Sequence, residues 1–196
     1  MKKSTKIWLI IAALLLVIGL GLSVAALAAV DFDVSRLNTE GAYERRTYTF
    51  DAEQLKSAEI QSVSQDIRVV GSDEKAGTVE YYTGERIGYA VSFSEGKLTI
   101  RHFDERRWYE HIHLFFSSRD DTVTVYVPTD TVFALTCHST SGNIEASGFT
   151  GNKLFLKNTS GSIRVSDITA AELEARSTSG SIEAARIRVT EGGAVL

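Results

Sequence analysis

The fold is decided by a seven-residue stretch that occurs three times in the chain: TSGNIEA at 140–146, TSGSIRV at 159–165 and TSGSIEA at 178–184. Successive copies begin 19 residues apart. A sequence that repeats itself at a fixed interval of about 20 residues is typical of a solenoid, in which each repeat forms one coil. The copies therefore predict an all-β, single-stranded β-solenoid, or β-helix, with 19-residue coils.

Superposing the copies shows which positions face the core, because aliphatic side chains recur at the same places in each coil. These inward columns are Leu135, Leu154 and Leu173; Cys137, Leu156 and Ala175; and Ile144, Ile163 and Ile182. A solenoid coil buries its apolar side only against its neighbours, so we expect these columns to form the core. Cys137 shares its column with Leu and Ala, which predicts a buried, unreactive thiol. As the only cysteine it cannot form an intramolecular disulfide.

The recurrence of Thr, Ser and Gly at the same place in each copy has a structural explanation. We expect the glycine column (Gly142, Gly161 and Gly180) to let the chain bend with positive φ, and the Ser and Thr hydroxyls to bond the turn backbone. The chain has no G-x-S-x-G elbow that would present a serine as a nucleophile. The serines are therefore interpreted as scaffold, and no catalytic residue is assigned.

A β pattern also extends upstream of the repeats. From Ala58 onward, short runs with period-2 alternation are separated by Gly, Asp and Ser, which is an all-β signature. Ser64–Val69 matches the repeat except at the glycine, which predicts a divergent first coil, and Glu95-Gly96 predicts a hairpin turn. The resulting boundaries are a juxtamembrane connector at 31–57 and a β-solenoid domain at 58–196, with clear repeats over 135–196.

The N-terminal region carries an apolar segment, Ile7–Val30, of 24 residues without a charge, and about 20 helical residues cross a bilayer core. Lysines at positions 2, 3 and 6 precede it. The positive-inside rule then predicts a single-pass anchor in the cell membrane, with 1–6 in the cytoplasm, 31–196 outside and the lipid bilayer as the segment's partner. A cleaved signal peptide is the alternative, because Ala26-Leu27-Ala28 fits the cleavage pattern. Both interpretations export the β domain.

Net charge argues against one class of partner. The chain carries a formal charge of −4, and without its three N-terminal lysines 18 basic residues face 25 acidic ones, a balance of −7. Binding of nucleic acid requires a basic surface that neutralises phosphates. The sequence therefore predicts no nucleic-acid partner for the exported part.

Several segments, taken in order, carry a family resemblance. They are the N-terminal span, Ser64–Val69, Lys97–Ile100, Trp108–Ile112 and Val123–Pro128, followed by the Thr-Ser-Gly repeats. The chain resembles a bacterial family of membrane-anchored, adhesin-like proteins, defined by a domain of unknown function with Thr-Ser-Gly β-solenoid repeats. The resemblance implies a β-solenoid at the cell surface, often associated with envelope-stress or regulatory membrane proteins. It supplies no catalytic residues.

Members of that family usually continue through more coils than the three clear ones seen here. Ala194-Val195-Leu196 resembles the opening strand of a fourth coil. We therefore expect either a truncated product or fragment, or a last sheet edge that a partner or a second copy covers.

The segment from 105 to 113 holds the side chains that could most readily bind a metal or a sugar. His111 and His113 would face the same way on a strand and could bind a metal together with Glu105, although a structural or surface role is the favoured interpretation. No metal or cofactor is therefore assigned. Trp108 and Tyr109 could contact a sugar ligand, while packing across a sheet is the commoner use of such residues.

These observations favour a non-enzymatic, membrane-anchored surface module for adhesion or for interaction and signalling within the cell envelope, with a membrane or cell-wall partner. The alternative is a protein that binds cell-wall polysaccharide, or an enzyme that acts on it, built on a β-helix scaffold. An enzyme should bring acidic or His side chains together in one outward groove that spans adjacent coils, whereas the outward columns here mix Glu, Arg, Lys and His.

Overall fold

The computed structural model describes residues 3–29, 44–106 and 121–195, which are mostly β with one N-terminal helix. The elements in chain order are α1 Lys3–Ala29, β1 Glu44–Phe50, η2 Ala52–Gln54, β2 Ser57–Gln61, β3 Ile67–Ser72, β4 Gly77–Thr83, β5 Ile87–Ser94, β6 Lys97–Asp104, β7 Val123–Pro128, β8 Phe133–Ser139, β9 Ile144–Ser147, β10 Thr150–Asn158, β11 Ile163–Ser177 and β12 Ile182–Val195. The helix belongs to one unit and all the strands belong to another, and each is described by itself.

Helix α1 is apolar around its whole circumference, as expected of a helix that does not pack on a soluble core. Within it, Lys6–Ala25 is long and apolar enough to cross a membrane. A signal sequence near an N-terminus has the same length and composition. The helix predicted over 7–30 is therefore present as far as Ala29, while Val30 lies outside the described residues. Its role as an uncleaved anchor stays a prediction.

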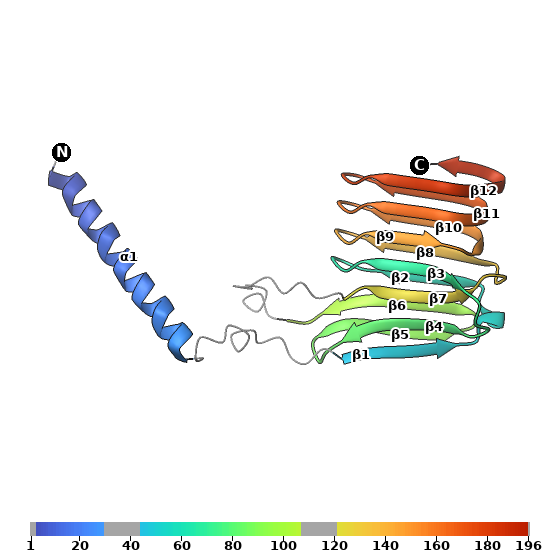
Figure 1. The fold of residues 1–196 in the computed structure, drawn as a ribbon, viewed down its shortest axis with the longest axis horizontal. Coiled ribbons are helices and arrows are strands. Elements are labelled where there is room, and N and C mark those ends of the chain that lie inside the picture. Colours follow the sequence, from blue (N-terminus) through green and yellow to red (C-terminus); the bar gives the residue numbers. More distant parts are fainter. Residues whose placement is uncertain (1–2, 30–43, 107–120, 196) are drawn as a thin grey trace. The chain divides into compact units, whose positions relative to one another are not determined.

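The strands form one sheet that folds back on itself into two walls (Figure 1). Ile163–Ser166 of β11 pairs with β9, whereas Thr169–Ser177 of the same strand pairs with β10. The first wall consists of β1, β4, β7, β3, β9 and Ile163–Ser166, and the second wall consists of Thr169–Ser177, β10, β8, β2, β6 and β5. Strand β12 pairs with both parts of β11, so it adds a rung to each wall. The chain has a solenoid-like β fold whose two walls enclose the core.

Parallel pairing stacks residues that lie 19 positions apart. These stacks include Leu135, Leu154 and Leu173 across the second wall and Ile144, Ile163 and Ile182 across the first. All of them are buried except Ile182, which is partly buried against the core. Cys137 lies between Ile60 and Leu156 and is fully buried. The predicted inward columns are therefore confirmed.

Two local predictions upstream of the repeats are also confirmed. Strand β3 stacks in parallel on β9, with Ile67 beside Ile144, so Ser64–Val69 leads into an additional rung. Glu95 and Gly96 close the β5–β6 hairpin, and both have positive φ angles, 54° and 80°.

The β domain begins earlier in the chain than the sequence analysis placed it. Strand β1, η2 and the first residue of β2 lie within 31–57, the segment assigned to a connector. Phe50 is buried, and its ring packs against the ring of Phe93 with 5.3 Å between centroids. β1 lies at the end of the sheet and pairs with β4. Because its other side chains are mostly polar and exposed, as is common at a sheet edge, its sequence gives little sign of a strand.

The positive φ angles predicted for the turn glycines are not observed. None of Gly142, Gly161 and Gly180 has a positive φ. They are required for a different reason, because a Cβ at each would overlap the carbonyl group of the rung below. Positive φ occurs instead at a second corner, where Gly148, Asp167 and Arg186 have φ angles of 73°, 55° and 54°. These three residues are also spaced 19 positions apart. The corner that they form separates the strand segments of the first wall from those of the second wall.

The segment predicted to open a fourth coil pairs with the rung before it. Ala194 lies beside Leu173 and Val195 lies beside Glu174, while Leu196 is outside the described residues. The offset is 21 positions rather than 19, because the register shifts between Ala170 and Glu172. The strand predicted at 194–195 is thus confirmed, with a departure from the strict repeat.

Candidate functional site

In two of the three Thr-Ser-Gly turns, the polar side chain just before the turn holds the turn backbone, whereas the buried Ser139 hydroxyl before the first turn has no hydrogen-bond partner. The Asn158 side chain donates from Nδ2 to the Gly142 carbonyl (2.6 Å) and accepts at Oδ1 from the Gly161 N–H (2.9 Å). In the next rung the Ser177 hydroxyl donates to the Gly161 carbonyl (3.2 Å) and accepts from the Gly180 N–H (2.9 Å). The sequence had predicted that the Ser and Thr hydroxyls of the turn itself would make these hydrogen bonds. The sequence does contain a sign of these hydrogen bonds, because a polar residue recurs at the inward position just before each turn, at Ser139, Asn158 and Ser177.

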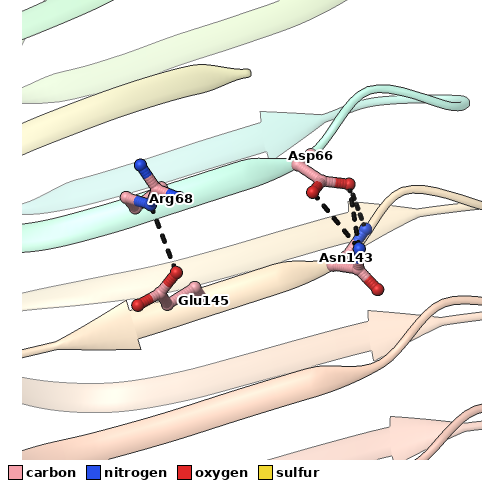
Figure 2. A network of polar contacts seen from close by, with 4 residues as sticks. All are labelled: Asp66, Arg68, Asn143 and Glu145. Carbon is pink, nitrogen blue, oxygen red and sulfur yellow. Dashed lines mark hydrogen bonds and ion pairs between the residues drawn. The ribbon is translucent and has the colours of Figure 1, made fainter. Parts of the chain in front are cut away.

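On the other side of the turn, side chains link three successive rungs of the first wall. The Asp66 carboxylate accepts from the Asn143 N–H (2.7 Å) and from its side-chain Nδ2 (3.2 Å), as Figure 2 shows. Asn143 in turn accepts at Oδ1 from the Ser162 N–H (3.0 Å). These hydrogen bonds fix the starts of β3, β9 and β11 relative to one another.

Two residues further along the same strands, the outward side chains alternate in charge. Arg68 Nε lies 3.2 Å from Glu145 Oε2 (Figure 2), and Arg164 Nε lies 3.1 Å from Glu183 Oε2. Each pair joins neighbouring rungs, and all four side chains remain at least one-third exposed. From the sequence alone the outward columns show only a mixture of Glu, Arg, Lys and His, because the alternation becomes an ion-pair ladder only when the rungs are stacked.

These two columns border a surface groove of about 250 Å³ on the first wall. Its polar lining includes Asp66, Arg68, Asn143, Glu145, Arg164 and Glu183. The groove combines hydrogen-bond donors and acceptors with charges that are largely paired to one another. Such a lining suits a polar ligand recognised through many hydrogen bonds, because specificity in a site comes from precisely placed polar groups.

Of the site residues proposed from sequence, only Glu105 lies within the described ranges, and it does not line this groove. Glu105 is exposed just beyond β6, and its N–H donates to the Arg86 carbonyl at 2.7 Å. His111, His113, Trp108 and Tyr109 all lie outside the described residues. Within the described ranges, no group of three or more His, Cys, Asp or Glu side chains is arranged to hold a metal.

Within the described β domain, the titratable side chains of Cys137 and Tyr89 are buried and that of His102 is partly buried. Burial raises the pKa of the Cys137 thiol and of the Tyr89 phenol, and it lowers the pKa of His102. The Tyr89 hydroxyl lies 2.9 Å from the Ser62 hydroxyl, and its ring meets that of His102 edge to face. None of the three lines the groove. Their uncharged forms are favoured, as expected of groups that serve packing.

The buried position of Cys137 predicts its reactivity. Thiolate is the reactive form, so a thiol with a raised pKa and no exposure should resist alkylation. We expect iodoacetamide to leave Cys137 unmodified in the folded full-length protein and to modify it fully in urea, as measured by mass spectrometry. Alkylation of the folded protein at the rate seen in urea would contradict the buried assignment.

Three solved bacterial structures are similar in part to this chain. One, a putative cell adhesion protein from Clostridium sporogenes, is 8% identical, with 78% of this chain and 98% of that chain covered and a TM-score of 0.37. A putative lipid binding protein from Parabacteroides distasonis is 15% identical over 74% of each chain, with a TM-score of 0.33. A putative adhesin from Bacteroides fragilis is 11% identical, with 75% and 97% covered and a TM-score of 0.26.

No curated protein matches the sequence. A family model described as Toastrack DUF4097 matches residues 55–196, which is most of the chain and contains β2 to β12. The match includes the Thr-Ser-Gly repeats and the upstream strands on which the resemblance rested. The chain therefore belongs to the Toastrack DUF4097 family.

Proposed function

We propose that this chain is a non-enzymatic surface module, anchored in the membrane by α1, whose first-wall groove binds a polar polymer of the cell envelope. The observation that carries the proposal is the groove lined by stacked, hydrogen-bonded side chains from successive rungs. A linear polymer is the ligand class that suits a surface repeating rung by rung, because extended solenoid surfaces offer equivalent contacts along their length.

Several features support this function. The 19-residue coil is the proposed building unit, since it returns the same outward side chains to the same wall. Anchoring by the N-terminal helix, with the β domain outside the cytoplasm, would make the groove accessible to polymers of the envelope. The carboxylates of the groove are occupied by Asn143 and arginine partners, which supports binding rather than acid–base catalysis.

Charge-neutral double substitutions test the groove. We expect Arg68→Gln/Glu145→Gln in the full-length protein, held in lipid nanodiscs, to weaken binding to cell-wall sacculi or soluble envelope polysaccharide about tenfold or more. Losing two or more good polar contacts of about 1 kcal/mol each gives an effect of that size. Folding should survive, because exposed ion pairs contribute only about 0–1 kcal/mol.

The matched control is Lys153→Gln/Glu172→Gln. This pair also joins neighbouring rungs, at 2.9 Å, and it is exposed, but it lies on the second wall. We expect the control to bind like the unchanged protein. Equal binding by both double variants, or no retention of the unchanged protein by any envelope polymer, would overturn the proposed function.

A further inference from the structure

The second wall carries an outward column of basic side chains next to the Thr-Ser-Gly turns. His138, Lys157 and Arg176 occupy successive rungs of β8, β10 and β11, and all three are exposed. Strands in a sheet lie about 4.8 Å apart, so these side chains form a regularly spaced line, here called the basic stripe. Below it, Gln61 and Arg101 continue the same column.

The basic stripe differs from the equivalent column of the first wall. There, Arg68, Glu145, Arg164 and Glu183 alternate in sign and pair between rungs. In the basic stripe no acidic residue interrupts the column. Like charges placed directly opposite each other on neighbouring strands are destabilising. The partners of this column lie within single strands or in the neighbouring column instead, as Glu174 does for Arg176 and Glu59 for Arg101.

The surroundings leave the middle of the stripe open to a ligand. Arg176 is paired with Glu174 at 2.6 Å, but among the described residues neither His138 nor Lys157 has an ion-pair partner. On the turn side, the stripe is bordered by exposed hydroxyl side chains of the next outward column. These are Thr140, Thr159 and Thr178. Cations beside hydroxyl donors are the groups that bind anionic oxygens.

We propose that the basic stripe binds a linear polyanion of the cell envelope, a polymer whose phosphate or carboxylate groups follow the line from His138 to Arg176. A chain of anions can contact the Lys157 ammonium and the Arg176 guanidinium on successive rungs, with the His138 side chain beside them, whereas a single small anion reaches only one rung. The stripe is on the second wall, so this site is independent of the first-wall groove and its variants leave the groove intact.

The test uses the full-length protein in nanodiscs of uncharged zwitterionic lipid, with fluorescent polyphosphate and polygalacturonate as probes. We expect Lys157→Gln to weaken binding of at least one probe about fivefold. It should also reduce the slope of log K against log salt by about 0.7, the value for one lost contact on a flexible polyanion. His138→Lys, which fixes a charge in the stripe, should strengthen the same binding.

The matched control is Lys153→Gln, which removes the same charge from the same strand but two columns away, where Lys153 pairs with Glu172. It should leave both affinity and salt slope unchanged. Equal losses in the two variants would show attraction by net charge and overturn the site. The proposal also fails if neither polymer binds, if orthophosphate competes as well as polyphosphate at equal phosphate concentration, or if only vesicles of anionic lipid bind.

Discussion

Gly161→Ala should destabilise the β domain by about 1–3 kcal/mol, the usual cost of forcing a methyl group into a close-packed site. A Cβ at this position would overlap the Gly142 carbonyl and crowd the Asn158 side-chain nitrogen. The backbone of one rung would then have to move away from the rung below it. Because rungs contact only their neighbours, the loss should spread to the stacking of β11 on β9 and β10.

Urea unfolding of the full-length protein in detergent, followed by far-ultraviolet circular dichroism, would measure this change. A loss of about 2 kcal/mol should also lower the melting temperature by roughly 4–8 °C for a protein of this size. Ser160→Ala is the control, since Ser160 is the exposed neighbour of Gly161 in the same turn. A Gly161→Ala protein as stable as Ser160→Ala would refute the role of close approach.

Asn158→Leu should be at least as damaging, with a loss of about 2–6 kcal/mol from two buried groups left without partners. The two side chains are similar in size, but leucine leaves the Gly142 carbonyl and the Gly161 N–H without their partner. Each buried group left without a hydrogen bond costs about 1–3 kcal/mol. The expected loss therefore comes from the turn rather than from a cavity.

Asn158→Ser provides the comparison that the fold itself suggests. Ser177 occupies the equivalent place in the next rung and bonds a glycine carbonyl and a glycine N–H there. We expect the serine variant to retain most of the stability that leucine loses in the same urea experiment. Equal destabilisation by leucine and serine would mean that side-chain volume, not hydrogen bonding, holds the turn.

The sequence was most informative where chemistry repeats with the coil. Leu154 and Ile163 could be placed in the core because their columns hold aliphatic residues in every copy. The second corner could not be predicted, since Gly148, Asp167 and Arg186 share a backbone conformation but no side-chain chemistry. Backbone geometry at that corner is imposed by the rungs on either side, so residues that ordinarily avoid positive φ are held there.

The binding surfaces were harder to predict than the core for a related reason. Glu145 and Lys157 are both outward and charged, and each belongs to a column whose residue type changes from copy to copy. Their neighbours in the sequence do not show which of the two is paired between rungs. Only the stacking register shows that Glu145 meets Arg68, whereas Lys157 follows His138. Strand β1 was not predicted from the sequence, because its exposed side chains are mostly polar. The aromatic and histidine residues at 108–113 remain candidates outside the described residues.

The stacking register also bears on how such proteins can change in length. Where the 19-residue register holds, adding or removing one whole unit leaves the remaining side chains in their original columns, because each rung presents equivalent bonding groups above and below. A single-residue insertion within a strand exchanges its inward and outward sides instead. Gene duplication and deletion in steps of one coil can therefore lengthen or shorten the exposed walls, and with them the stretch of polymer they could contact, without redesign of the core.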